Sequence, residues 1–394
     1  MKSIHSLLVI LFPLVSSCSA AGSRGEVSEV AGASAGTLSI ARIRAQLADP
    51  QAHAPFVPVA PVGLGDLADF IPAENPLTPA KVELGRQLYF DPRLSLDGTV
   101  SCATCHHPAK GWTDNLPASV GIDGQIGGRS APTVVNRILG KSQFWDGRAA
   151  TLEVQALGPI GNPIEMGFSP EKAAQRLSEI EGYQLQFRAV FGGGPTPDRI
   201  AKAIGAFERT VISGGNKNDY YEQALPFFDF EPEEDEDPEF LARMDRVLDL
   251  EAEHRMSEAA ERGRELFFGK AQCSACHAGQ DLSDEEFHNL GIGFESANPD
   301  KGREEYTGLE ADRGRFRTPS VRNIALTAPY MHDGRLKSLM EVVEHYDKGG
   351  TSNPWLSDKV FPLNLSDREK KDLVLFMEEA LTGTFPDIGI PRLP

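Results

Sequence analysis

The sequence has few basic residues and no long apolar run. Of its 394 residues, 39 are Lys or Arg and 57 are Asp or Glu, and the formal net charge is −18 at pH 7. Such a surface repels phosphate backbones, so nucleic-acid binding is not expected. The apolar stretch at residues 4–15 is shorter than the roughly 20 residues that span a bilayer, and no later segment is long and apolar enough. Hydrophobic residues still make up 40% of the chain, which excludes a long disordered or collagen-like protein.

Cysteine is also scarce, with five residues. A secreted disulfide scaffold would have more cysteines and an even number. The first cysteine follows a basic residue, Lys2, and the apolar stretch, a pattern that resembles a bacterial lipoprotein signal. We predict a signal peptide at residues 1–17 and a lipid on Cys18, which would be the only membrane contact of a periplasmic or cell-envelope protein. Ordinary secretion with a fortuitous cysteine is the alternative.

The rest of the chain is predicted to be mainly α, with two breaks in composition. Residues 18–74 are predicted to be a lipoprotein tether and lead-in, poorly ordered to about Val62, because Ala, Gly, Ser and Pro dominate there. Residues 229–239 carry eight acidic residues and no basic one. Such a run is typical of a solvated connector, and a docking site for a basic partner is the alternative. Helical periodicity occurs at residues 79–90, 170–180, 197–211 and 238–268.

An internal repeat runs through the chain. Three blocks recur in the same order: residues 85–90 and 263–268, residues 132–136 and 319–323, and residues 145–148 and 332–335. In the last two blocks position 132 corresponds to 319 and position 145 to 332, which is one shared offset of 187. The repeat predicts two copies of one small helical domain.

Each copy contains one Cys-x-x-Cys-His motif, and the two motifs use the four remaining cysteines. The spacing places two thiols one helical turn apart, where they can form thioethers with a haem while the adjacent histidine ligates the iron. Zinc would need the two cysteine pairs close together, and a redox pair would leave the histidines unexplained. We therefore predict two covalent c-type haems. The predicted residues are Cys102, Cys105 and His106 for the first haem, and Cys273, Cys276 and His277 for the second.

With these motifs, the duplicated chain resembles the bacterial di-haem cytochrome c peroxidases and their relative MauG, and it is nearer to the MauG-like branch. The segments that carry the resemblance are residues 143–149, 155–159, 162–166 and 328–334. The resemblance implies an oxidoreductase that acts on hydrogen peroxide with a redox protein partner. The implied organisation is a cytochrome c-like domain at residues 75–225, an acidic connector at 226–255 and a second cytochrome c-like domain at 256–394.

The resemblance also assigns the chemistry around the first haem. It makes Glu165 the acid/base that moves a proton between the peroxide oxygens, and Gln155 the amide that positions them. Trp145 matches a tryptophan between the haems that relays charge. The alternatives are an exposed loop carboxylate for Glu165 and a buried core residue for Trp145. Glu153 is a competing carboxylate, but two residues from Gln155 on a helix it would point elsewhere.

A distal histidine is missing from the first haem pocket. The peroxidase branch closes this pocket at rest with a histidine, and this chain has Ile122 at the corresponding position. No histidine occurs between His107 and His254, and His107 neighbours the proximal ligand on the same side of the ring. We therefore predict a five-coordinate or water-bound first haem without prior reduction, with Pro159 crowding its distal side.

The second haem is predicted to have a tyrosine ligand. Adding the offset of 187 to Pro159 gives Tyr346, which is a methionine in the peroxidase branch and a tyrosine in MauG-like members. A phenolate favours higher oxidation states than a thioether, so Tyr346 would let the second haem share oxidising equivalents. The alternative ligands are His345, Met340 and Met331.

The family also holds a calcium ion between its two domains, through two backbone carbonyls and an asparagine. Thr327 and Pro329 fit the carbonyl positions. Ser130 stands where the asparagine is expected, so the resemblance predicts calcium with an altered ligand set.

Three functional hypotheses follow. The first is a MauG-like oxidoreductase that uses peroxide to oxidise an external partner. The second is a cytochrome c peroxidase that reduces peroxide to water with electrons from a small cytochrome c. The third is a non-catalytic di-haem electron carrier, which Glu165, Gln155 and the missing distal histidine disfavour.

Overall fold

The computed structural model describes residues 37–233, 236–386 and 388–394. All of these residues fall in one compact unit. The predicted signal peptide and Cys18 lie outside the described residues. Within the described ranges, no helix combines the length and the apolar character needed to cross a membrane.

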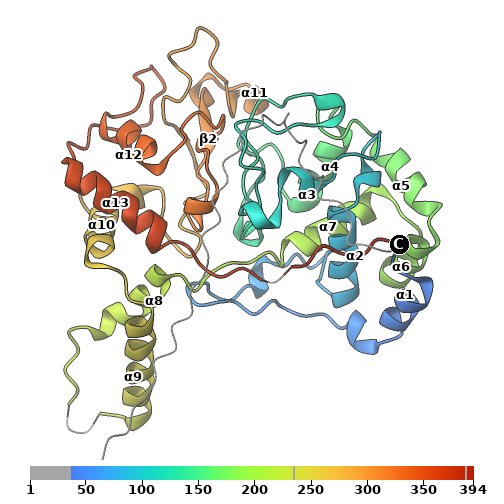
Figure 1. Cartoon of the computed structure of the whole chain (residues 1–394), viewed down its shortest axis with the longest axis horizontal. Coiled ribbons are helices and arrows are strands. Elements are labelled where there is room, and N and C mark those ends of the chain that lie inside the picture. Colours follow the sequence, from blue (N-terminus) through green and yellow to red (C-terminus); the bar gives the residue numbers. More distant parts are fainter. Residues whose placement is uncertain (1–36, 234–235, 387) are drawn as a thin grey trace, which may run out of the picture. The chain divides into compact units, whose positions relative to one another are not determined.

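Helices dominate the described residues, which confirms the mainly α prediction (Figure 1). The first half of the chain contains α1 (Ile40–Leu47), α2 (Pro79–Tyr89), α3 (Cys102–Cys105), α4 (Leu152–Gly161), α5 (Pro170–Ser178), α6 (Glu181–Phe191), α7 (Pro197–Glu208) and α8 (Lys217–Ala224). The second half contains α9 (Pro238–Glu253), α10 (Glu258–Phe268), α11 (Glu304–Thr307), α12 (Leu339–Asp347) and α13 (Asp367–Glu379). The only sheet among the described residues is the antiparallel pair β1 (Phe287–Asn289) and β2 (Arg315–Arg317).

Both halves are built on the same close crossing of two helices. Helix α2 packs on α7 in the first half, and α10 packs on α13 in the second. A Cβ atom added to Gly85 would lie 1.8 Å from the carbonyl oxygen of Ala203, and one added to Gly263 would lie 2.0 Å from that of Asp372. Only glycine lets the two backbones approach so closely. The first block of the sequence repeat therefore encodes a shared helix crossing.

The offset of 187 residues is also visible in the backbone. Isolated antiparallel bridges join Gln143 to Ala149 and Tyr330 to Leu336. In both bridges the first residue donates its N–H to the second residue's carbonyl over 2.7 Å. Because these pairs are 187 residues apart, the loops that follow each motif fold alike, and the duplication is structural as well as sequential.

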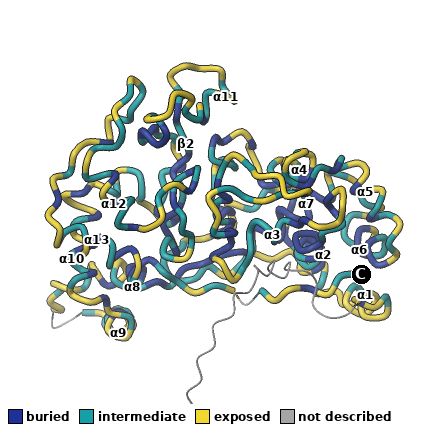
Figure 2. Tube along the Cα trace, turned by 45° about the horizontal axis from the view of Figure 1, so that its top comes forward, coloured by how far each residue is buried: buried dark blue, intermediate teal, exposed yellow. Residues whose placement is uncertain are grey.

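Each half has its own hydrophobic core (Figure 2). The first core is drawn from residues 84–211 and includes the fully buried Trp112 and Tyr89. The second core is drawn from residues 256–381 and includes Phe267 and Phe376. The exact domain boundaries at 75, 225 and 256 stay a prediction.

The expectation of a poorly ordered lead-in is wrong for the segment around α1. The Ser39 hydroxyl accepts a hydrogen bond from the N–H of Arg42 over 3.3 Å and caps this helix. Ile43 is only 1% exposed, and a Cβ added to Gly182 of α6 would lie 2.8 Å from its Cδ1 atom. Helix α1 is thus anchored beside α6 (Figure 1). One buried isoleucine decides its position, and the Ala-rich and Gly-rich composition hides that signal.

The acidic connector contains one helix, α9, which forms a helical hairpin with α8 just before the connector. Helix α9 packs along α8 (Figure 1). The ring centroid of Phe240 lies 6.0 Å from that of Phe227 and 5.4 Å from that of Phe230, edge to face. These aromatic contacts explain why a strongly acidic segment holds a defined structure.

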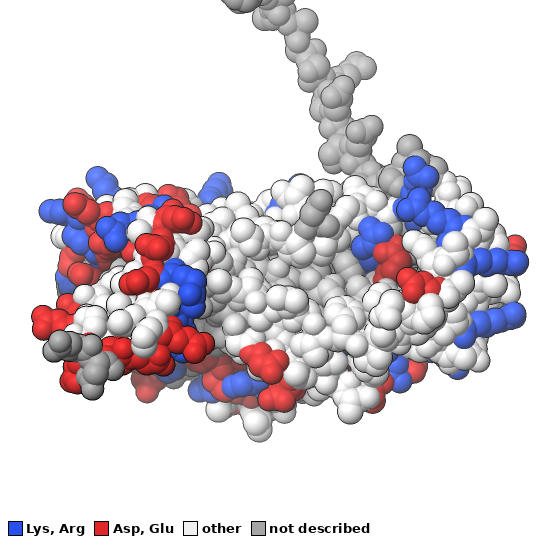
Figure 3. Space-filling view, turned by 90° about the horizontal axis from the view of Figure 1, so that it is seen from below, with Lys and Arg blue, Asp and Glu red and all other residues white. Residues whose placement is uncertain are grey.

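On the face in Figure 3, acidic and basic side chains gather toward the two sides of the view, and the middle carries few of them.

Replacing Gly85 with Ala should destabilise the first half. The new Cβ would overlap the Ala203 carbonyl, and overpacking of this kind costs about 1–3 kcal/mol. Urea unfolding of the holoprotein measures the loss. The matched control is Gly161→Ala in the last turn of α4, where an added Cβ meets no described atom within 4 Å outside its own helix. The control should change stability by less than about 0.5 kcal/mol. Equal losses in both variants would contradict the close crossing.

Candidate active site

The first Cys-x-x-Cys-His motif forms one helical turn beside a cavity. Helix α3 (Cys102–Cys105) is capped by Ser101, whose N–H donates to the Thr104 hydroxyl over 3.0 Å. The two thiols therefore stand one turn apart, and His106 follows directly. Cys105 and His106 line a cavity of about 1190 Å³, and the buried Nδ1 atom of His106 finds no hydrogen-bond partner in the described part of the chain. An imidazole with a buried, unpartnered nitrogen on a cavity wall fits a metal ligand.

The second motif lies on a second cavity. Cys273, Cys276 and His277 all line it. Nδ1 of His277 lies 3.1 Å from the carbonyl oxygen of Leu282. A nitrogen that donates to this carbonyl leaves Nε2 free to bind a metal, and such a bond fixes the ring orientation.

The four thiols have surroundings that do not suit redox exchange. All four are free of disulfides in the described part of the chain. Burial raises the pKa of Cys105 to about 11 and that of Cys273 to about 12. Both thiols are therefore protonated near neutral pH, whereas a thiol that exchanges with disulfides reacts as the thiolate. Two thiols, one histidine and an adjoining cavity in each half fit a covalently attached haem.

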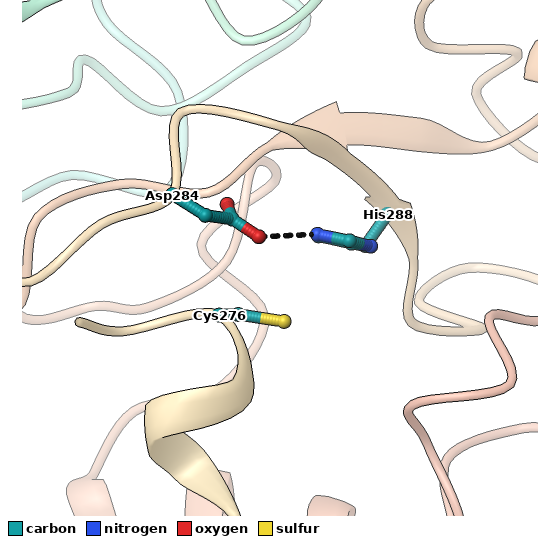
Figure 4. A group of neighbouring side chains, drawn as sticks. All are labelled: Cys276, Asp284 and His288. Atoms are coloured by element: carbon teal, nitrogen blue, oxygen red, sulfur yellow. Dashed lines mark hydrogen bonds and ion pairs between the residues drawn. The ribbon is translucent and has the colours of Figure 1, made fainter.

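A further group of donor atoms lies beside the second motif (Figure 4). One ligand atom each from Cys276, Asp284 and His288 lies within 4.8 Å of the other two, and His288 Nε2 is 2.9 Å from Asp284 Oδ2. Cys276 belongs to the haem motif, and a thioether there cannot supply the thiolate that a separate metal would need. We therefore assign no additional metal site to this group.

Three residues expected on the distal side of the first haem line the first cavity. They are Gln155, Pro159 and Glu165. Gln155 and Pro159 lie one turn apart on α4, and Glu165 follows in the next loop. Burial raises the pKa of Glu165, although Asn162 Nδ2 donates to its Oε1 over 2.8 Å. A shielded and oriented carboxyl group with a raised pKa is suited to accept and return a proton.

The competing carboxylate of Glu153 is engaged elsewhere. Its oxygens accept from Arg209 over 2.5 and 3.1 Å and from Asn75 Nδ2 over 2.7 Å. Burial opposes ionisation, but pairing with Arg209 still lowers the pKa of Glu153 to about 2. Glu153 is not among the described residues that line the first cavity, whereas Gln155 is.

The position of the missing distal histidine is filled by Ile122. Its N–H donates to the Glu165 carbonyl over 2.9 Å, and its buried side chain packs so closely on Gly167 that no Cβ fits there. Among the described residues that line the first cavity, His106 is the only histidine. His107 uses Nδ1 to accept the N–H of Ala109 over 3.1 Å.

Tyr346 lines the second cavity, just as Pro159 lines the first. It lies near the end of α12, on the same face as Leu339 and Val343, which also line the cavity. Burial raises the pKa of Tyr346 well above its ordinary range. A bound cation would therefore be needed to hold this phenol as a phenolate.

The alternative ligands of the second haem divide into two groups. Met331 also lines the second cavity, but His345 and Met340 are not among the described residues on its wall. Nε2 of His345 lies 2.9 Å from the carbonyl oxygen of Leu290. The sequence did not single out Met377, which lies on the cavity wall and comes from α13. Only the helix crossing brings it there.

Trp145 lines both cavities. Its Nε1 donates to the Ser130 carbonyl over 2.8 Å, and its own carbonyl accepts from the N–H of Arg317 over 2.7 Å. Its repeat partner His332 stacks on Phe316 with ring centroids 3.6 Å apart and lines the second cavity. The indole is therefore held at the wall that the two sites share.

The predicted calcium ligands line the second cavity together. They are Ser130, Thr327 and Pro329. The side chain of Asn115, which the sequence did not single out, donates to the Leu326 and Ala328 carbonyls over 3.0 and 2.9 Å. Calcium binding itself stays a prediction.

A buried charged network joins the two halves between the cavities. Arg137 and Arg317 line both cavities. Nη1 of each lies close to Oε1 of Glu285, at 2.7 and 2.6 Å, and all three side chains are almost completely buried. Two guanidinium groups share the Glu285 carboxylate, and the buried carboxyl group of Asp281 also acts on both of them, so a network of opposite charges lies between the cavities. These three residues are far apart in the sequence, so no local sequence pattern predicts that they form a network.

The fold and the site thus define a di-haem c-type cytochrome with a polar pocket at its first haem. The family model for di-haem cytochrome c peroxidases matches residues 79–224. The chain is 41% identical to the methylamine utilization protein MauG of Methylorubrum extorquens, over 82% of this chain and 84% of that protein. It is 35% identical to the cytochrome c551 peroxidase of Nitrosomonas europaea, over 83% and 90%. Among solved structures, a MauG-like protein associated with microbial copper homeostasis matches with a TM-score of 0.67 and 31% identity, over 85% and 95%.

The chain belongs to the di-haem cytochrome c peroxidase family. It is an oxidoreductase of the cytochrome c peroxidase type that acts on peroxide, carries two c-type haems and has a redox protein partner. The cytochrome c-like fold that the resemblance implied is confirmed. The non-catalytic carrier is excluded, whereas the relatives include both MauG proteins and peroxidases and do not separate those two branches.

Replacing Arg137 with Gln should weaken the contact between the halves. The change removes donors from Glu285 and from its neighbour Gln143, and buried acceptors left without donors cost about 1–3 kcal/mol. Urea unfolding of the holoprotein measures the loss. The matched control is Arg44→Gln, which breaks an exposed pair with Glu181 and should cost less than about 1 kcal/mol. A loss no greater than that of the control would contradict the structural role of the network.

Proposed function

We propose that this chain is a MauG-like, peroxide-dependent di-haem oxidoreductase that oxidises an external partner, such as a protein side chain, in the periplasm or cell envelope. The observation that carries the proposal is Tyr346 on the wall of the second cavity, at the position where the resemblance expects the MauG-like tyrosine. A haem bound in each half supplies the redox chemistry by accepting oxidising equivalents from peroxide.

In this proposal the first cavity handles the peroxide. Glu165 takes a proton from one peroxide oxygen and returns it to the departing oxygen, and its raised pKa suits both steps. Gln155 orients the peroxide from the neighbouring turn of α4. Because His106 is the only histidine among the described residues of this wall, peroxide has an open position without prior reduction.

The second cavity stores part of the oxidising power. Tyr346 faces it together with His277, and a phenolate donor favours the higher oxidation states of a bound iron. Trp145, which lines both cavities, is the proposed relay between the sites. Its hydrogen bond to the Ser130 carbonyl gives an oxidised indole an acceptor for its N–H.

A detoxifying cytochrome c peroxidase is the second candidate function. It would reduce peroxide to water with electrons from a small cytochrome c. Met331 on the wall of the second cavity favours it, because a thioether ligand raises the potential of a haem and suits electron entry.

Tyr346→Met decides between the two functions. In the wild type, EPR and optical spectra of the diferric protein should show a high-spin haem beside a low-spin one. Stoichiometric peroxide should then give a long-lived state two equivalents above the resting protein, which Tyr346→Met abolishes. The matched control is Tyr330→Phe, which changes another tyrosine on the same cavity wall and should keep that state. Two low-spin haems that react with peroxide only after one-electron reduction would contradict the MauG-like function.

Glu165→Gln should slow the reaction with peroxide by about 10²–10⁴-fold, the usual contribution of an acid/base group. The wild-type rate should fall as the pH is lowered through the pKa of Glu165, which burial raises above its ordinary value of 4.5. The Gln variant should lose this pH dependence, because it has no proton to exchange. Stopped-flow measurements check both effects. The control is Glu171→Gln on α5, which should react with peroxide like the wild type. If Glu165→Gln kept the pH profile of the wild type, another group would be moving the proton.

A further inference from the structure

Glu208 is a buried carboxyl group that the proposed chemistry does not use. It is the last residue of α7, it is 4% exposed, and it lines the first cavity. Its Oε2 atom has no hydrogen-bond partner among the residues that the structure describes. An unpartnered carboxyl oxygen in a protein interior costs free energy, so this residue needs an explanation.

The basic groups near Glu208 are already engaged. The charged and titratable groups that face it are Arg209 directly after α7, Glu153 on α4, Arg137 in the segment before α4, Tyr89 on α2 and Cys102 on α3. Arg209 binds Glu153, and Arg137 binds Glu285. Burial raises the pKa of Glu208 to about 8. Without a charged cofactor beside it, the carboxyl group therefore titrates near pH 8.

The repeat provides a counterpart for Glu208 in the second half. At the two helix crossings, a Cβ added to the crossing glycine would lie 2.9 Å from Phe207 Cβ in the first half and 2.7 Å from Phe376 Cβ in the second. The residues that follow these phenylalanines are Glu208 and Met377, and each lines the cavity of its own half. In the second half an apolar side chain, Met377, occupies the place that Glu208 has in the first half. Packing at this place therefore does not require a carboxyl group.

We propose that Glu208 is a proton-holding residue that couples the redox state of the first haem to proton uptake. When one electron enters the first haem site from a soluble reductant, the Glu208 carboxylate takes one proton from solvent through the cavity and forms an O–H bond. When the electron leaves, that bond breaks and the proton returns to solvent. The inference goes beyond the proposed function, because it needs only a haem in the first cavity and holds for either branch of the family.

The direction of the coupling follows from electrostatics. An oxidised haem site is more positive than a reduced one and stabilises a nearby carboxylate, so the pKa of Glu208 is lower in the oxidised protein. Between the two pKa values, reduction brings proton uptake, and the reduction potential of the first haem falls as the pH rises. Met377 gives the second haem no such group.

Spectroelectrochemical titration of the holoprotein at a series of pH values tests the inference. The potential of the first haem should fall by up to about 59 mV per pH unit, the value of a tenfold step for a one-electron couple. Glu208→Gln keeps the shape of the side chain but cannot titrate, so it should remove the slope. Glu208→Asp should restore it.

Glu208→Met, which copies the residue of the second half, is the second variant and should also lack the slope. Two measurements check that each variant is folded. Absorbance should give two haems per chain, and the potential of the second haem should be unchanged. A slope that persists in Glu208→Gln or Glu208→Met would overturn the inference, as would a wild-type first haem whose potential does not change with pH. This equilibrium readout is independent of the spectra of Tyr346→Met, so failure here is distinguishable from failure of the proposed function.

Discussion

The close crossing of two helices in each half is the contact on which the rest of the structure depends. Gly85 and Gly263 let the backbones touch, which fixes the helix that precedes each haem motif against the helix that closes the cavity. A residue at the end of the closing helix then falls on the cavity wall, Glu208 in one half and Met377 in the other. A small change in the crossing would therefore move both the attachment site and the opposite wall.

The two haem sites are not independent, because they share part of one wall. Trp145, Arg137 and Arg317 each line both cavities. The guanidinium groups meet on Glu285 from opposite halves, so a change of charge in one cavity acts on groups that also line the other. In a buried network of this kind, removing one partner leaves the others unsatisfied. One of the contacts that hold the halves together is thus also a contact through which their electrostatics are coupled.

The sequence predicts those features that depend on short spacing. The Cys-x-x-Cys-His motifs, the mainly helical character and the step from Pro159 to Tyr346 all follow from local or repeated patterns. Features that form where distant segments of the chain meet cannot be predicted from such local patterns. The pairing of Arg137 with Glu285 needs the tertiary fold, and helix α1 is held by one buried residue, Ile43, in a segment whose composition suggests a tether.

The duplication shows how one fold can serve two different redox sites. The shared backbone keeps the motif, the helix crossing and the loop bridges in both halves, so the differences reside in single side chains at equivalent places. The first cavity has Pro159 and Glu208 where the second has Tyr346 and Met377. A proline cannot bind iron and leaves room for peroxide, whereas a tyrosine offers an oxygen donor. A carboxyl group can hold a proton, whereas a thioether cannot. In our proposals, these two differences give one site a carboxyl group that holds a proton and give the other an oxygen donor for iron.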